Sequence, residues 1–196
     1  MPYYRNYQNG GRVDPGLIKN WFAENYGTDI DAVEGLIGQI SKAESDNRNI
    51  VQITEGGGEG KGRGYFQFET KKGSGAFQTA LTRTERLYGN LGKNVPNWVK
   101  NAKKSDDATT LNRRQQEEVL LANFAENPRA KREMIMGALE SGDAKDLWLQ
   151  AHWAGKKEDK KEKSKYWDEK FGIPEMPEMA GGGDVRGQNT DTVPAM

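Results

Sequence analysis

The chain has 196 residues, with 29 basic and 29 acidic side chains, no cysteine and a single histidine, His152. The absence of cysteine excludes disulfides, thiolate metal sites and cysteine nucleophiles. One histidine does not support a histidine-based zinc site. A formal net charge of zero does not favour a nucleic-acid partner, because duplex binders usually carry a basic excess. The sequence therefore predicts no metal, no cofactor and no nucleic acid.

The chain divides into three regions of different composition. Only 34% of its residues are hydrophobic, which indicates that part of the chain lies outside a packed core. Residues 1–13 are predicted to form an N-terminal arm and residues 14–172 a single domain. Residues 173–196, rich in Gly, Pro and Met, are predicted to form a tail or linker. Neither a secretory signal nor an apolar stretch of membrane-spanning length is visible.

The periodicity of apolar residues predicts a mainly helical domain, α or α+β. About six or seven helices are expected, the first opened by Asp14-Pro15 as N-cap and first-turn residues. A short β-like run, Ile50–Ile53, interrupts them and precedes a glycine-rich loop over 56–64. The charged run 156–165 is predicted to be a solvated helix face or loop, and the aromatic residues after it are expected to fold back onto the domain.

Glu44 stands at the end of the second predicted helix. Ile30, Val33, Ile37 and Ile40 recur at three- and four-residue steps, and Glu44 is the next position on that helix face. Burial of a carboxyl group without a paired cation disfavours its charged form and raises its pKa. A glutamic acid that keeps its proton can serve as a general acid. The alternative is that the helix frays before this position and the side chain faces water.

Three short segments occur in a characteristic order. They are Glu44-Ser45 at a helix end, GYFQ (residues 64–67) after the glycine-rich loop, and AHWAG (residues 151–155) at a later helix end. The pattern resembles the lysozyme-like lytic transglycosylases of the soluble type, which show a catalytic Glu followed by Ser, then GLMQ, then AYNAG. The resemblance covers about residues 30–155. It implies a lysozyme-like fold and cleavage of the MurNAc–GlcNAc β-1,4 bond in the glycan strands of bacterial peptidoglycan.

The resemblance also implies roles for individual residues. Glu44 would act first as acid and then as base, while the 6-hydroxyl of the sugar attacks and leaves a 1,6-anhydro end. Ser45 would fix the geometry of this carboxyl group or touch the reacting sugar. Gln67 and the backbone around Gly64 would bind the N-acetyl or peptide side of the glycan.

Four ring-bearing side chains admit two interpretations each. Tyr65 and Phe66 either form part of the cleft floor or belong to the core. His152 and Trp153 replace the Tyr and Asn of the family. The family Tyr is expected to hydrogen-bond the catalytic Glu, which His152 could do only as a donor; it could instead be a packed or capping histidine. Trp153 could stack on a sugar ring or fill the core beside Trp148.

A second carboxylate across the cleft would make the enzyme a hydrolysing lysozyme, because most glycosidases use two carboxylates. The candidates are Asp46, Glu55, Glu59 and Glu69, and Glu69 is the foremost because it lies just past the GYFQ segment. The glycine-rich loop lacks the GK[ST] ending of a phosphate-binding loop and is predicted to be a mobile lip of the cleft.

The segment AGGGDVRGQNTDTVPAM, residues 180–196, resembles a glycine-rich segment of phage virion proteins. This second resemblance implies a virion-associated transglycosylase that aids genome delivery and acts on the wall in the host periplasm. Its tails would contact other virion proteins. Two alternatives stay open: a hydrolysing phage lysozyme or endolysin, and a catalytically inactive structural virion protein.

Overall fold

The computed structural model describes residues 16–70, 75–152 and 157–172. The predicted arm, the whole predicted tail region, Asp14-Pro15 and Trp153 lie outside these ranges. The described residues form eight α-helices and one small three-stranded sheet, which confirms the predicted mainly helical, α+β class. The α-helices are α1 (Leu17–Tyr26), α2 (Ile30–Ser45), α3 (Ala76–Asn90), α4 (Asn97–Ser105), α5 (Arg113–Ala125), α6 (Arg132–Ser141), α7 (Lys145–Leu147) and α8 (Lys157–Phe171).

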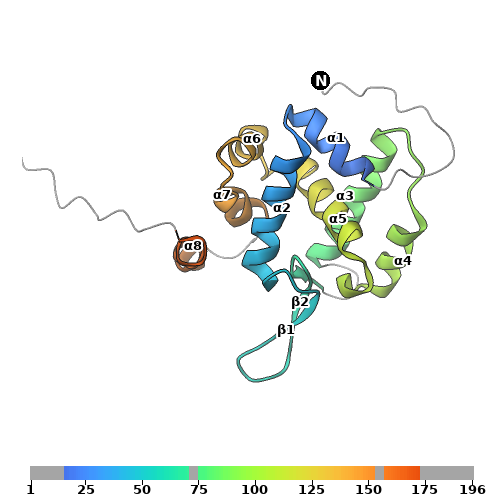
Figure 1. Ribbon diagram of the computed structural model, residues 1–196. Coiled ribbons are helices and arrows are strands. Elements are labelled where there is room, and N and C mark those ends of the chain that lie inside the picture. Colours follow the sequence, from blue (N-terminus) through green and yellow to red (C-terminus); the bar gives the residue numbers. More distant parts are fainter. Residues whose placement is uncertain (1–15, 71–74, 153–156, 173–196) are drawn as a thin grey trace, which may run out of the picture.

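The helices enclose one hydrophobic core. Helices α3 and α5 pack against each other, α1 packs on α5, and α2 contacts α1 and α6 (Figure 1). The largest fully buried side chains come from helices, from the sheet region and from the C-terminal helix, so all of these elements share the core. They include Phe22, Phe66, Phe77, Tyr88, Phe124, Trp148 and Trp167.

Helix α2 has clear start and stop signals. The Asp29 carboxylate caps it by accepting a hydrogen bond of 2.8 Å from the Ala32 N–H. The predicted apolar face is buried along its length, with Ile30 only partly covered. The helix ends where Asp46 and Asn47 adopt left-handed backbone, with φ of 52° and 61°. Glu44 therefore lies in the last turn, on the face that points inward.

The sheet follows α2 directly. Its strands β1 (Ile50–Ile53), β2 (Glu59–Gly64) and β3 (Phe68–Glu69) are antiparallel in the order β1-β2-β3, and the β1–β2 hairpin projects from the end of α2 (Figure 1). The prediction of a loop over 56–64 is thus wrong for its second half, which is strand β2. A Cβ on Gly60 would come within 2.6 Å of Gln52 Oε1, so a larger residue there would have to displace the exposed Gln52 side chain.

The chain near the third segment also departs from expectation. The sequence predicts the end of an ordinary helix there, whereas the structure has the short α7 followed by a π-helix, η2 (Trp148–His152). Single π-helical turns are frequent at functional sites, because they reorient side chains relative to a regular helix. The remaining short element is the 3₁₀-helix η1 (Ala108–Thr110).

Helix α8 contains most of the predicted charged run and confirms the helical alternative for it. The aromatic residues at its end fold back as expected: Trp167 is 1% exposed, and its ring lies 5.1 Å from that of Trp148. Lys145 and Asp168 form an ion pair at 2.6 Å that links α7 to α8. Among the described helices, none combines the length and apolar character needed to cross a bilayer.

Candidate functional site

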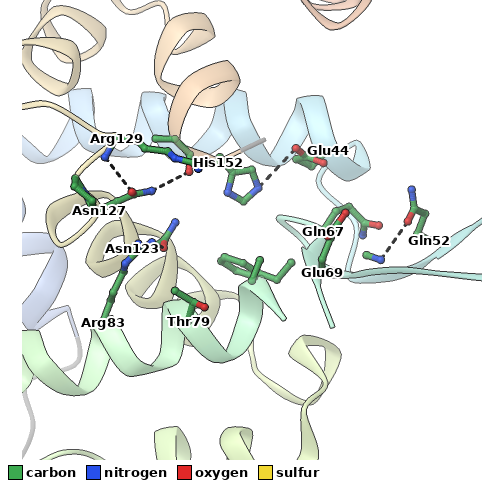
Figure 2. Close-up of a pocket in the computed structure, with 15 residues that line it drawn as sticks. Glu44, Gln52, Gln67, Glu69, Thr79, Arg83, Asn123, Asn127, Arg129 and His152 are labelled. Atoms are coloured by element: carbon green, nitrogen blue, oxygen red, sulfur yellow. Dashed lines mark hydrogen bonds and ion pairs between the residues drawn. The ribbon is translucent and has the colours of Figure 1, made fainter. Parts of the chain in front are cut away.

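A cleft of about 650 Å³ opens between the sheet and the helices (Figure 2). Its wall is assembled from α2, the three strands, α3, α5, the α5–α6 connection and η2. The described residues that line it are Glu44, Gln52, Gly62, Gln67, Phe68, Glu69, Ala76, Thr79, Arg83, Asn123, Asn127, Pro128, Arg129, Ala151 and His152. Each of the three segments singled out in the sequence therefore contributes at least one residue to a single cleft.

The Glu44 side chain is 14% exposed and presents its carboxyl group to this cleft. Burial raises the pKa of Glu44, because the charged form loses its hydration. The nearby His152, the hydrogen bond from Trp148 and two lysines of α8 act in the opposite direction, and the direction of the shift remains upward. This outcome agrees with the expectation from the apolar helix face.

Trp148 supplies the hydrogen bond that Glu44 receives. Its indole Nε1–H donates to Glu44 Oε1 at 2.5 Å. The indole is 2% exposed and packs against the rings of Trp167 and Tyr166 from α8. The Tyr166 hydroxyl in turn donates to the Ala43 carbonyl at 2.8 Å, next to the acid in sequence. Sequence reasoning treated Trp148 only as a core residue and missed this role.

His152 bonds to the backbone of the GYFQ segment instead of to the acid. Its Nε2 lies 2.7 Å from the Phe66 carbonyl oxygen. Since a carbonyl can only accept, Nε2 carries the hydrogen and donates it. The same Nε2 is 3.6 Å from Glu44 Oε1, which is too long for a hydrogen bond. The direct bond suggested for His152 is therefore made by Trp148, and His152 joins the second and third segments.

Gln67 lines the cleft and is held in a strained position. Its backbone has φ of 46°, and its Nε2 donates to the Gly64 carbonyl at 2.7 Å and to the Ile50 carbonyl at 3.2 Å. Both amide hydrogens are thus used, and no described residue donates to the Oε1 atom. A Cβ at Gly62 would come within 2.6 Å of that oxygen, so glycine there gives the carboxamide its space. Gln67 consequently offers an acceptor that a ligand can use.

Four other predicted binding residues do not line the cleft. Phe66 is 0% exposed, so of its two interpretations the core position holds, and its ring does not form the cleft floor. Tyr65 is partly buried against the core, with the Arg113 guanidinium 5.0 Å from its ring centre. Tyr65 is not among the residues that line the cleft, so it does not form part of the cleft floor either.

Ser45 and Gly64 stabilise the walls of the site without lining the cleft. The Ser45 hydroxyl donates to the Tyr65 carbonyl at 2.8 Å, so it ties α2 to the GYFQ segment; it is buried and does not reach a ligand. Gly64 has φ of +81°, and its missing Cβ leaves room for Gln116, whose Oε1 accepts the Tyr65 N–H at 2.8 Å. These contacts replace the substrate contacts predicted for both residues.

Only one of the four candidate second carboxylates lines the cleft. Glu69 does so from β3, where its side chain is exposed. Asp46 lies outside and pairs with Lys170 at 2.9 Å. Glu55 and Glu59 are exposed on the β1–β2 hairpin, outside the lining, and Glu59 pairs with Arg63.

Sequence reasoning missed the polar residues at the far end of the cleft. Arg83 Nη1 donates to Asn123 Oδ1 at 2.6 Å. Asn127 Nδ2 donates to the Ala151 carbonyl at 3.0 Å, and its Oδ1 accepts the Arg129 N–H at 3.1 Å. The Asn-Pro dipeptide at 127–128 was a visible signal, but it predicts a helix boundary and not a binding role.

In the part of the chain that the structure describes, no group of three or more His, Asp or Glu side chains could hold a metal ion. No protein-family model, curated protein or solved structure matches the chain.

Proposed function

We propose that the protein cleaves the MurNAc–GlcNAc β-1,4 bond of peptidoglycan glycan strands, with Glu44 as general acid and then general base. The observation that carries the proposal is a buried carboxyl group of raised pKa at the wall of a cleft that also contains Gln67 and His152. The order of the three segments, which resembles that of the lytic transglycosylases, supports it further.

The chemistry needs a proton donor that stays protonated until substrate binds. Glu44 gives its proton to the glycosidic oxygen as the C1–O bond breaks through an oxocarbenium-like transition state. The resulting carboxylate then takes the proton of the sugar's 6-hydroxyl while that oxygen bonds to C1. The products are a free 4-hydroxyl on one strand and a 1,6-anhydro end on the other. Glu44 is left protonated for the next cycle.

A second candidate function is hydrolysis, and one observation favours it. Glu69 lines the same cleft, so it could activate a water molecule in place of the intramolecular hydroxyl. The product would then be a reducing end. The surrounding residues Gln52 and Gln67 are neutral, which leaves Glu69 as the only acidic partner for Glu44 among the described lining residues.

The proposed setting is a phage virion, with the enzyme opening the host wall during genome delivery and its tails contacting other virion proteins. The C-terminal resemblance alone supports this setting. An inactive structural virion protein is the third possibility, and the cleavage assay separates it from the other two.

The test is digestion of purified murein, followed by mass spectrometry of the new chain ends. Anhydro-muramyl ends support the transglycosylase, reducing ends support the lysozyme, and no cleavage supports the structural protein. Glu44→Gln should lower the rate by roughly 100- to 10,000-fold, the usual contribution of a general acid. Glu118→Gln is the matched control, because Glu118 is also buried with a raised pKa but lies outside the cleft lining. Equal rates for the parent and Glu44→Gln would contradict the proposal.

A further inference from the structure

We propose that the end of the cleft formed by Arg83 and Arg129 binds a carboxylate of the muramyl units, so that the site selects muramyl strands over neutral amino-sugar polymers. This inference rests on the proposed function and adds a specificity site to it. In Figure 2 the two arginines lie toward one end with Asn123 and Asn127, and Glu44 and Glu69 lie toward the other.

Arg83 has more hydrogen-bonding capacity than the protein uses. A guanidinium group carries five N–H donors, and the structure shows one side-chain hydrogen bond, to Asn123 Oδ1 at 2.6 Å. Arg83 is half-buried, and burial together with the positive charges of Arg86 and Arg129 lowers its pKa, against an opposing effect of Glu126. Its positive charge is therefore incompletely compensated by the described residues.

Glu126, the acid whose charge acts on Arg83, is engaged elsewhere. Glu126 pairs with Arg86 at 3.6 Å and accepts a hydrogen bond from Asn90 at 3.3 Å, and it does not line the cleft. The acids that do line the cleft, Glu44 and Glu69, lie toward its opposite end. An anion entering beside Arg83 would thus meet a cation without displacing an existing ion pair.

Arg129 adds a second cation whose backbone is fixed. Its N–H donates to Asn127 Oδ1, and Asn127 is itself anchored to the Ala151 carbonyl. The exposed Arg129 side chain makes no hydrogen bond or ion pair with a described residue. Two guanidinium groups at one end of a cleft suit a carboxylate, which they bind through paired, charge-assisted hydrogen bonds.

The chemistry of the strand identifies where this carboxylate can come from. Amino-sugar rings are neutral when N-acetylated. Each muramyl unit adds a lactyl group, whose carboxyl is either free or joined to a stem peptide with carboxylates of its own. The arginine end therefore recognises a carboxylate that accompanies the muramyl unit, and the lactyl and stem sources differ only in their distance from the ring.

Calorimetric binding tests the inference in the Glu44→Gln background, which prevents cleavage. Three tetrasaccharides serve as ligands. The first is the neutral tetramer of N-acetylglucosamine, the second alternates N-acetylglucosamine with muramyl units that carry free lactyl groups, and the third is the same alternating tetrasaccharide with stem peptides. Arg83→Gln/Arg129→Gln should weaken binding of a carboxylate-bearing ligand by about tenfold or more, since hydrogen bonds to charged groups are worth about 1.5–3 kcal/mol. Binding of the neutral ligand should not change.

Two comparisons make the result specific. Lys100→Gln/Lys104→Gln removes the same charge from exposed positions of α4 outside the cleft lining and should leave all three affinities unchanged. Arg129→Gln alone changes an exposed side chain, so it gives an answer even if the Arg83 variant fails to fold. If the arginine variants bind the free-lactyl ligand more weakly, the bound carboxylate is that of the lactyl group. If only the stem-bearing ligand binds more weakly, the bound carboxylate belongs to the stem peptide.

The inference is overturned if all ligands bind and the arginine variants weaken them equally or not at all. If the parent background binds none of the three ligands, the proposed function itself fails, and the inference falls with it.

Discussion

The Trp148 indole donates a hydrogen bond of 2.5 Å to the Glu44 carboxyl group. This contact orients the acid, and it lowers the pKa of Glu44 against the larger upward effect of burial. The raised pKa of Glu44 therefore results from burial, which is opposed by the charges of His152 and two lysines of α8 and by the hydrogen bond from Trp148. Of these opposing effects, the hydrogen bond can be removed by a single substitution that keeps an aromatic ring.

Trp148→Phe removes the donor and keeps an aromatic ring. The pKa of Glu44 should rise further, because the bond that stabilises the carboxylate is lost. In the pH profile of murein cleavage, the limb where activity falls as the acid deprotonates should move to higher pH. Trp167→Phe is the matched control, since it trims a buried ring that touches Trp148 without removing this bond. A limb that stays in place, or moves to lower pH, would contradict the assigned role.

Glu44→Gln should stabilise the fold at high pH. A carboxyl group whose pKa is raised by folding contributes stability below its unfolded-state pKa and loses it as pH rises through the folded-state pKa. The neutral glutamine avoids that loss, so above the folded-state pKa of Glu44 the variant should have a larger free energy of unfolding than the parent. This difference in free energy should become smaller as the pH is lowered. Urea denaturation over a pH series measures it. A parent that becomes relatively more stable as pH rises would refute the claim.

Gly64→Ala should destabilise the protein through two effects. The left-handed backbone, φ +81°, costs about 1–3 kcal/mol for a non-glycine residue. The added Cβ would also displace Gln116 and its bond from the Tyr65 N–H. Gly57→Ala is the control, because Gly57 has φ +78° but no described neighbour within 4 Å of the added carbon. Denaturation should show the larger loss at position 64; equal losses would mean that Gln116 adapts freely.

Gln67→Glu should weaken both the fold and the activity. Glutamate is nearly isosteric, but its carboxylate would face the carbonyls of Gly64 and Ile50, to which the glutamine amide now donates. Loss of these bonds should lower the free energy of unfolding by about 1–3 kcal/mol. Gln52→Glu, an exposed cleft position on β1, tests whether added charge alone explains the effect. Unchanged denaturation of Gln67→Glu would show that the amide does not brace the GYFQ segment.

The parts of the fold that could be predicted follow local rules. The apolar face of α2, its Asp29 cap and the position of Glu44 come from residues close together in the sequence. Strand β2 could not be predicted, since its glycines favour a loop locally and pairing with β1 and β3 overrides that preference.

The parts of the site that could not be predicted depend on distant segments. The bond from Trp148 to Glu44 joins residues 104 positions apart and depends on a π-helical turn that has no simple sequence signal. The alternation of aromatic and polar residues around Phe66 indicates that some of these side chains are buried. It does not indicate which of them faces the cleft. Arg83 and Arg129 line the same cleft only because the fold places α3 beside the α5–α6 connection.

The central claim is that Glu44 holds its proton in the cleft beyond the ordinary range of a glutamate side chain. Carbon-13 NMR titration of the glutamate carboxyl signals, compared between the parent and Glu44→Gln, measures this directly. We expect the signal that is absent from the variant to titrate above that range. A midpoint within or below it would contradict the account.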